Sequence, residues 1–368
     1  MEFNLFQNNS PLKSAEKKGW KLFKFTEILK DDTKNATKIK KENYLSNGTY
    51  PIIDQGKQFV AGYCNDEVNL YKNYPVIIFG DHTRIIKYIN FPIYLGADGV
   101  KLFKVKEGIN VKYIYYFLEN VDLPNDGYSR HYKYLKDVII AIPNLETQKN
   151  IAEVLDKAQE LIDKRKEQIK AMDELVKSRF IEMFGNVITN SKNWDTELLG
   201  EICELKAGKS IKAKDIYDEC SNELYPCYGG NGLRGYVKNY SHEGNINLIG
   251  RQGALCGNVK YTSGKFYATE HAVVTQPKAN VNINTYWLHF VLRELDLNRL
   301  STGAAQPGLT VGKLNEVEIP KVSIELQNKF ADFVNQVDKL KSQMETSLKE
   351  LEDNFKSLMQ KAFKGELF

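Results

Sequence analysis

The most regular pattern in this chain is an apolar stripe that occurs twice. Apolar residues recur at alternating intervals of four and three between Gln148 and Phe184, and again between Gln327 and Phe363. This spacing is typical of a coiled-coil seam. Each stripe predicts a helix of about 33 residues, about 50 Å long, and each helix supplies the partner that the other needs. The predicted seam comprises Ile151, Leu155, Ile162, Ile169, Met172, Val176, Phe330, Val334, Val337, Met344, Leu348, Leu351, Phe355 and Leu358.

Local signals mark both ends of each predicted helix. Asn144 and Ser323 each offer an N-cap side chain, and each is followed two residues later by a glutamate that favours the helix dipole. Gly185 and Gly365 lie just beyond the stripes and are typical of helix C-termini. The two helices therefore begin and end in matching ways.

Three charged residues interrupt the stripe: Arg165, Arg179 and Lys341. A charge at a seam position lowers stability but can fix the register of the helices. If the helices run antiparallel with full overlap, none of the three faces an opposite charge across the layer. We expect their aliphatic stems to extend towards solvent, or these points to face another subunit.

The rest of the chain also forms an internal repeat. Trp20 and Trp194 open similar segments, and the run VIIFGDHTR at 76–84 is matched by INLIGRQG at 246–253. The repeated unit is a globular half followed by a long helix. The expected parts are domain 1 at 1–143, a first spacer helix at 144–185, domain 2 at 186–322 and a second spacer helix at 323–368.

The globular halves have the pattern of mixed α and β structure. Short apolar runs closed by glycine, at 76–80 and 246–250, predict buried strands. Residues 109–121 and 283–295 predict amphipathic helices with an aromatic-rich face, which at helical spacing is more often core than a base-stacking platform. The expected class is α+β, with two mixed α/β domains and two long helices.

Composition narrows the context without giving a function. The chain has 368 residues and a net charge of +4, which permits a nucleic-acid partner without demanding one. It has no apolar run of 18 residues and no apolar N-terminal leader, so we expect no membrane span and a cytoplasmic location. The five cysteines include no CxxC pair, which favours reduced thiols over disulfides or zinc.

Sequence motifs for catalysis are missing. The chain has no HExxH, no GxSxG, no Walker lysine and no signature of amino methyltransferases, and its histidines are scattered. Residues 230–235 fit GxGxxG, but residues 236–245 do not have the pattern of a helix, and Pro226 interrupts the preceding strand. We interpret this segment as a tight turn that presents Arg234 rather than as a phosphate loop.

Basic and amide residues recur in both halves on predicted turns after buried strands. Arg can bridge O6 and N7 of guanine and Gln can bridge N6 and N7 of adenine, whereas Lys suits phosphates. A single charged loop residue is more often only solvated, but recurrence across the repeat favours these loops as a group. Their side chains differ between the halves, which suits a reader of two different half-sites. The candidate DNA-binding residues are His82, Arg84, Lys87, Arg130, His131, Lys133, Arg234, Arg251, Gln252, Lys260, Arg299 and Gln306.

The whole chain resembles the specificity (S) subunit of a type I restriction-modification system. The resemblance rests on Trp20 and Trp194, on the segments 143–148 and 320–327 that enter the helices, on the terminal AFKGELF, and above all on the doubled order of half and helix. It departs from a strict repeat where Gly99 stands at the position of His271.

The resemblance implies an architecture and a set of partners. Two target recognition domains would be held apart by an antiparallel coiled coil, and each would read one part of a bipartite double-stranded DNA target. The chain would be non-catalytic and carry no cofactor. Two modification subunits, which bind S-adenosylmethionine and methylate adenine, and restriction subunits would join it, with ATP and Mg²⁺ expected in these partners. Helices about 50 Å long suit half-sites about one DNA turn, ~34–36 Å, apart.

Three other classes stay open. The recognition subunit of a type IIB-like restriction system would share the repeat, and neighbouring genes encoding separate or fused partners would discriminate. A pure assembly scaffold would add no sequence preference to a modification subunit. A stand-alone enzyme is disfavoured by the missing motifs.

Overall fold

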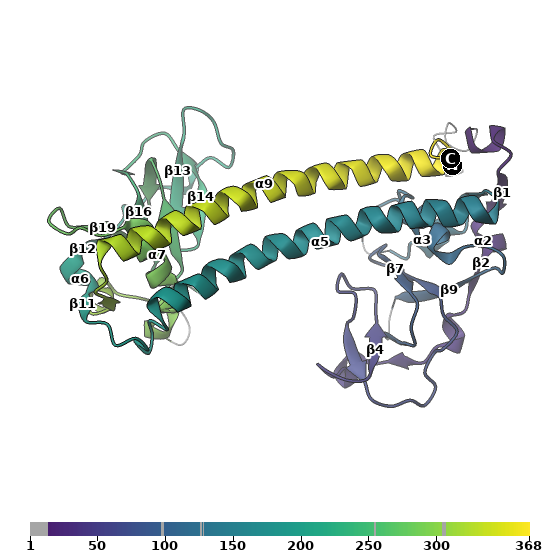
Figure 1. Cartoon of the computed structure of the whole chain (residues 1–368), viewed down its shortest axis with the longest axis horizontal. Helices are drawn as coiled ribbons and strands as arrows, with labels where there is room; N and C mark the ends of the chain where they lie inside the picture. The colour runs from purple at the N-terminus through teal and green to yellow at the C-terminus, as the bar shows by residue number, and fades with distance from the viewer. Residues whose placement is uncertain (1–13, 97–98, 126, 128, 254, 304–306) are drawn as a thin grey trace. The chain divides into compact units, whose positions relative to one another are not determined.

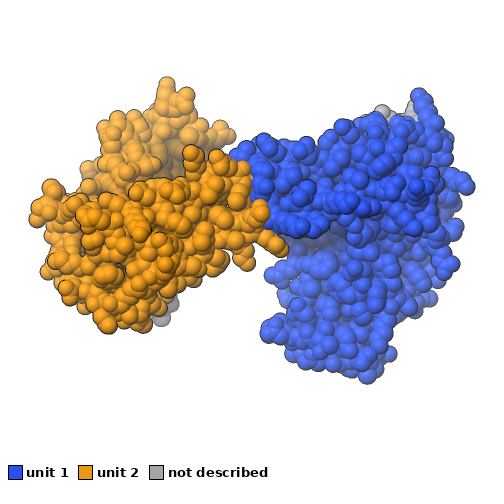
Figure 2. Space-filling view, in the orientation of Figure 1, with its two compact units in different colours: residues 1–166, 346–368 blue, residues 167–345 orange. Residues whose placement is uncertain are grey.

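The chain divides into two compact units. The computed structural model describes residues 14–96, 99–125, 127, 129–253, 255–303 and 307–368. Unit 1 contains residues 1–166 and 346–368, and unit 2 contains residues 167–345 (Figure 2). The boundary passes through both long helices, α5 (Leu145–Phe184) and α9 (Ile324–Phe363), which are teal and yellow-green in Figure 1. Each unit therefore holds one globular domain, the start of one long helix and the end of the other.

Domain 1 is the globular part of unit 1, residues 20–142. Its largest sheet is antiparallel with the strand order β2-β9-β6-β7, and a second sheet has the order β3-β8-β4-β5. A short antiparallel pair, β1 with β10, closes the domain. Its strands and helices are β1 (Lys21–Lys24), α2 (Phe25–Ile28), β2 (Leu29–Asp31), β3 (Lys38–Ile39), β4 (Tyr50–Ile53), β5 (Gly62–Cys64), β6 (Val76–Gly80), β7 (Ile86–Ile89), β8 (Tyr94–Gly96), β9 (Val100–Val105), α3 (Val111–Glu119), α4 (Tyr132–Leu135) and β10 (Ile139–Ile142).

Domain 2 is the globular part of unit 2, residues 194–320. Its main sheet, β12-β19-β16-β17, is antiparallel and matches that of domain 1 strand for strand, while its second sheet has the order β14-β13-β18-β15. Its strands and helices are β11 (Thr196–Leu198), α6 (Leu199–Ile202), β12 (Cys203–Ala207), β13 (Tyr225–Gly229), β14 (Gly232–Val237), β15 (His242–Glu243), β16 (Ile246–Gly250), β17 (Val259–Thr262), β18 (Lys265–Ala268), β19 (Ala272–Pro277), α7 (Thr285–Glu294), α8 (Val311–Asn315) and β20 (Glu318–Pro320).

The sequence predicted the central elements of both domains. The runs at 76–80 and 246–250 are the central strands β6 and β16, and every residue in them is buried. The expected amphipathic helices are α3 and α7, which pack on the main sheets and bury their aromatic faces. Fully buried Tyr113 and Trp287 are the largest side chains on these faces. The aromatic stripes are therefore core, and the α+β class is confirmed.

A buried glutamine joins each domain to the first turn of the long helix that follows it. Gln148 Oε1 accepts a hydrogen bond of 2.9 Å from the backbone N–H of Asn110, the N-cap of α3. Gln327 Oε1 accepts the equivalent bond, also of 2.9 Å, from Asn284, the N-cap of α7. Both glutamines also donate to a carbonyl five residues upstream. Each domain is thus fixed to its own helix by the same buried hydrogen bonds.

Each domain also contacts the end of the other long helix. In unit 1, Trp20 lies against Gly365, the left-handed residue (φ +71°) just beyond α9. In unit 2, the indole N–H of Trp194 donates to the carbonyl of Phe184, the last residue of α5, at 3.1 Å. Gly185 comes next, with φ +78°. The predicted stop signals and N-caps are confirmed, with Thr147 N–H donating to Asn144 Oδ1 at 2.8 Å.

The helices pair in an antiparallel sense within each unit. In unit 1, the start of α5 shares a core with the end of α9, as Leu155 and Phe355 show. In unit 2, Phe180 near the end of α5 packs edge to face on Phe330 near the start of α9, with ring centroids 5.4 Å apart. Among the predicted seam residues, those that are buried are Ile151, Leu155, Ile162, Val176, Phe330, Val334 and Val337, and those that are half-buried are Ile169, Met172, Met344, Leu348, Leu351, Phe355 and Leu358.

The expectation that no seam charge faces an opposite charge is wrong for Lys341. Its ammonium lies 2.6 Å from the carboxylate of Asp173, which is adjacent in sequence to the predicted neighbour Met172. Arg179 instead pairs with Glu182 of its own helix at 2.8 Å, with its guanidinium over the ring of Phe333. Such exposed pairs contribute about 0–1 kcal/mol each. Of the two, only the Lys341–Asp173 pair joins the two helices and can favour one register.

Two absences concern the described part of the chain. No helix there is long and apolar enough to cross a bilayer. All five cysteines are described and none is in a disulfide. Burial raises the pKa of the Cys203 thiol to about 12, which keeps it protonated and unreactive at neutral pH.

Candidate nucleic-acid interface

Loops from separate parts of domain 1 meet where the central strand β6 ends. Gly80, the last residue of β6, pairs with Val100 of β9. The next residue, Asp81, donates its N–H to the carbonyl of Gly99 at 2.7 Å, and its own carbonyl accepts from the N–H of His131 at 2.8 Å. These two bonds bring the turns before β9 and α4 to the loop after β6.

Domain 2 repeats this framework with different side chains. Gly250, the last residue of β16, pairs with Ala272 of β19. Arg251 donates its N–H to the carbonyl of His271 at 3.0 Å, and its carbonyl accepts from the N–H of Leu309 at 2.9 Å. Arg251 therefore occupies the position of Asp81, and Gln252 that of His82. One backbone scaffold presents unlike chemistry in the two domains.

The glycine at the end of each central strand, Gly80 or Gly250, allows another loop to pack closely against the backbone. A Cβ on Gly250 would lie 2.1 Å from the carbonyl oxygen of Gly230, in the β13–β14 hairpin. A Cβ on Gly80 would lie 2.2 Å from Thr83 Oγ1 and 2.8 Å from Gln55 Cβ, in the β4–β5 connection. A larger residue would displace these loops, so glycine is required for the close approach.

Three of the candidate residues in domain 1 line the surface of this loop cluster. Arg130 and Lys133 are exposed, and the Lys133 ammonium lies 4.7 Å from the centroid of the Tyr134 ring. His82 is half-buried, with Nδ1 3.2 Å from the carbonyl oxygen of Ser129. These three residues remain candidates for contact with DNA.

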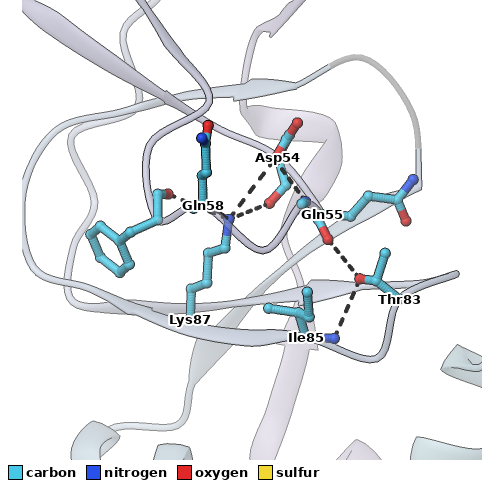
Figure 3. Close-up of polar contacts among 8 residues, drawn as sticks. Asp54, Gln55, Gln58, Thr83, Ile85 and Lys87 are labelled. Atoms are coloured by element: carbon cyan, nitrogen blue, oxygen red, sulfur yellow. Dashed lines mark hydrogen bonds and ion pairs between the residues drawn. The ribbon is translucent and has the colours of Figure 1, made fainter. Parts of the chain in front are cut away.

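Three other candidates in domain 1 point into the protein. His131 is fully buried, with Nδ1 3.0 Å from the carbonyl of Asp81. Arg84 has φ +63° and donates to the carbonyl of Leu123 at 3.0 Å. Lys87 has a side chain only 4% exposed, and its ammonium lies among carbonyls of the β4–β5 connection (Figure 3). We withdraw Lys87 and His131 as direct DNA contacts because neither side chain reaches solvent.

In domain 2, Arg234, Gln252, Lys260 and Arg299 are exposed and Arg251 is half-buried. Arg234 lies on β14, which forms a β-hairpin with β13. The GxGxxG segment is therefore a two-residue turn followed by a strand, and no helix comes after it. Arg299 donates from Nε to the carbonyl of Leu295 and lines a separate pocket near the end of α5. Gln306 lies outside the described residues. The loop cluster therefore presents Arg234, Arg251 and Gln252, while Lys260 lies on β17.

Buried polar atoms without a hydrogen-bond partner gather in these same loops. In the part of the chain described, they include Ser129 Oγ and His131 Nε2 in domain 1, and Arg251 Nε, Thr269 Oγ1 and Glu270 Oε2 in domain 2. Folded proteins leave few such atoms unpaired, and five of the seven in the described residues lie in these loops, which makes the loops a candidate site for a polar ligand. The described residues hold no cluster of His, Cys, Asp and Glu that could bind a metal ion.

The β4–β5 connection, residues 54–61, is a part of the cluster that was not predicted from the sequence. Gln55 Oε1 accepts from the N–H of His82 at 3.2 Å, and its backbone carbonyl accepts from Thr83 Oγ1 at 2.7 Å. Gln58 is exposed in the same connection. One sequence signal was available. Residues 54–61 stand in the repeat where Gly230–Gly235 stand in the second half, and the two segments differ in both sequence and length.

A duplicated pair of α+β domains, each with polar loops at the end of a central strand and each fixed to one of two antiparallel helices, defines a protein with two recognition domains. The family described as the type I restriction modification DNA specificity domain matches residues 17–171 and 191–353, so the chain belongs to this family. Specificity subunits of type I systems are non-catalytic DNA recognition subunits.

Individual relatives agree with this family. The chain is 48% identical over 143 residues to the EcoprrI specificity subunit of Escherichia coli. The matched segment covers 39% of this chain and 35% of that protein. The chain thus spans about a third of that relative. It is 27% identical over 209 residues to a putative type I specificity subunit, S.MpnORF201P, of Mycoplasma pneumoniae, covering 56% of this chain and 85% of the relative.

Solved structures show the same fold. A type I restriction-modification S subunit from M. genitalium superposes with a TM-score of 0.61 at 18% identity, covering 93% of this chain and 96% of that one. A chain from a study of complex assembly and conformational transition of the type I R-M system gives a TM-score of 0.57 at 16% identity, covering 94% and 98%. At these identities the likeness supports the fold alone.

Proposed function

We propose that each domain reads one half of a bipartite DNA target, and that the helix pair sets the distance between the half-sites and docks modification subunits. The observation that carries this proposal is the shared backbone framework with unlike side chains. Asp81 and His82 in domain 1 stand where Arg251 and Gln252 stand in domain 2. Equal scaffolds with unequal loops suit two readers of different sequences.

The exposed side chains divide by the chemistry they offer. Gln252 carries an amide that can bridge N6 and N7 of adenine, and Arg234 a guanidinium that can bridge O6 and N7 of guanine. Arg130, Lys133 and Lys260 carry charges suited to phosphates, which position a protein without reading sequence. The proposed partner is double-stranded DNA.

The helix pair carries exposed leucines outside its seam. Leu161 and Leu175, 55% and 44% exposed, lie two heptads apart and so share one face of α5. In unit 2, Leu175 and Leu340 (49% exposed) each precede a seam residue, which places them on the same side of an antiparallel pair. Apolar side chains gathered on one face suit a docking surface. We assign this face to the modification subunits, and restriction subunits complete the proposed complex. In this proposal S-adenosylmethionine, ATP and Mg²⁺ bind to those partner subunits and not to this chain.

Substituting Gln252 with alanine tests the reading of DNA by the loop cluster. In a complex of this chain with its modification subunit, Gln252→Ala should lower discrimination at one base pair of the second half-site by roughly 5- to 150-fold, the loss of one bidentate contact. The measurement is the rate of methylation of DNA targets in which the second half-site is randomised.

Gln276→Ala is the matched control, because Gln276 is exposed on β19 of the same domain but lies at the other end of that strand from His271. This control should leave discrimination unchanged. An equal loss of methylation on every sequence with Gln252→Ala would contradict base reading by Gln252. A wild-type complex without sequence preference would favour the scaffold class instead.

A further inference from the structure

Two lysines at equivalent positions of the repeat have different surroundings. Lys87 on β7 pairs in register with Ile78 of β6, and Lys260 on β17 pairs with Leu248 of β16. The Lys87 side chain is only 4% exposed, whereas Lys260 is exposed. The strands are the same in the two domains, so the difference arises from what covers them.

The connection that precedes each strand pair explains the difference. In domain 1, residues 54–61 join β4 to β5, whereas in domain 2 only residues 230–231 separate β13 from β14. The longer connection folds over Lys87 (Figure 3). The Lys87 ammonium donates to the carbonyls of Asp54 at 2.9 Å and Gln58 at 2.6 Å.

The same ammonium holds the rest of this connection as well. It lies 3.4 Å from the carbonyl of Phe59 and 3.9 Å from the carboxylate of Asp54. Burial lowers the pKa of Lys87 and the Asp54 charge opposes this. A buried cation is tolerated only when it is paired and hydrogen-bonded, and here the backbone of one loop supplies those partners. The conformation of the loop and the charge of Lys87 therefore depend on each other.

The loop that Lys87 holds presents exposed side chains beside the cluster after β6. The Gln58 carbonyl is bound by Lys87 while its side chain is exposed, and Phe59 is 49% exposed. At its other end, the loop contacts the segment after β6 through the Gln55 carbonyl and Thr83 Oγ1. An exposed amide on a fixed backbone is preorganised for hydrogen bonding to a base edge, for which adenine is the best match.

We propose that residues 54–61 form a base-reading loop that domain 2 lacks, with Gln58 contacting a base of the first half-site and Lys87 as its positioning residue. This inference rests on the proposed reading of DNA by domain 1. It assigns Lys87 a role in specificity even though its side chain does not reach the DNA.

The test uses the complex of the full chain with its modification subunit and a DNA library randomised in both half-sites. Gln58→Ala should lower discrimination at one base pair of the first half-site by roughly 5- to 150-fold. Lys87→Met should lower discrimination at that same base pair, because the loop is no longer held. Neither variant should alter preference in the second half-site. The control, Lys260→Met, should lower methylation evenly across the library, as expected for loss of a phosphate contact.

The readouts separate this inference from a merely structural role and from the wider proposal. Unchanged first-half preference in Gln58→Ala would overturn the inference, and so would an even loss across the library in a folded Lys87→Met chain. Thermal unfolding shows whether Lys87→Met folds, and if it does not, Gln58→Ala decides. If the wild-type complex prefers no sequence, the proposed function itself is overturned. If the wild-type complex reads both half-sites, the variants test only the role of residues 54–61.

Discussion

Replacing residues 194–320 with the corresponding domain of another specificity subunit is expected to change the second half of the DNA target and leave the first half unchanged. The physical reason is that the cores are separate. The core of unit 2 is built from residues between Met172 and Val337, and the main core of unit 1 from residues before Leu155 and after Phe355. The substitution therefore alters one core and one loop cluster only.

The junctions of this exchange should retain the contacts that fix domain 2 to the helices. The incoming domain must therefore supply the equivalents of Asn284, which bonds to Gln327, and of Trp194, which bonds to the end of α5. The measurement is the methylated sequence motif before and after exchange. The reciprocal exchange of residues 20–142 serves as the control and should change only the first half. A change in both halves after either exchange would show that the domains do not read independently.

Removing one heptad from each long helix is expected to shorten the gap between half-sites by about three base pairs. Seven residues contribute about 10.5 Å of helix, and base pairs stack about 3.4 Å apart. The Lys341–Asp173 pair indicates the register of the two helices in unit 2, and this register matches residues 162–168 of α5 with residues 346–352 of α9. Deleting these two segments keeps the four-three spacing of both seams.

Targets with gaps of different lengths, methylated by the complex, give the measurement for this deletion. Deleting the heptad from α5 alone is the control, and it should destabilise the chain because α5 and α9 then no longer match in length. If the double deletion leaves the preferred gap unchanged, the helices do not act as a ruler.

The regular parts of the fold could be predicted from sequence because local patterns determine them. Strands β6 and β16 are continuous apolar runs closed by glycine, and Asn144 and Gly185 mark the ends of α5. These features depend on neighbours in sequence. The antiparallel sense of the helices came from the family resemblance rather than from the seam itself.

The site was harder to predict because it depends on contacts between distant segments. Lys87 and Lys260 occupy equivalent positions, yet only Lys87 is covered, since the length of a connection some 30 residues earlier decides its exposure. The backbone N–H of His131 donates to the carbonyl of Asp81, and the His131 side chain is buried. These two residues lie 50 positions apart in the sequence. Lys341 forms an ion pair with Asp173, which lies next to the seam residue Met172 and not at a seam position itself. Sequence pattern indicated the positions of these charges but not their neighbours.

The most direct test of the central claim is a map of methylated adenines in cells that contain the modification subunit with and without this chain. Two domains that read separate half-sites predict methylation at one bipartite motif, with a fixed unread gap, only when the chain is present. The same methylated sites in its absence, or a single uninterrupted motif in its presence, would contradict the account.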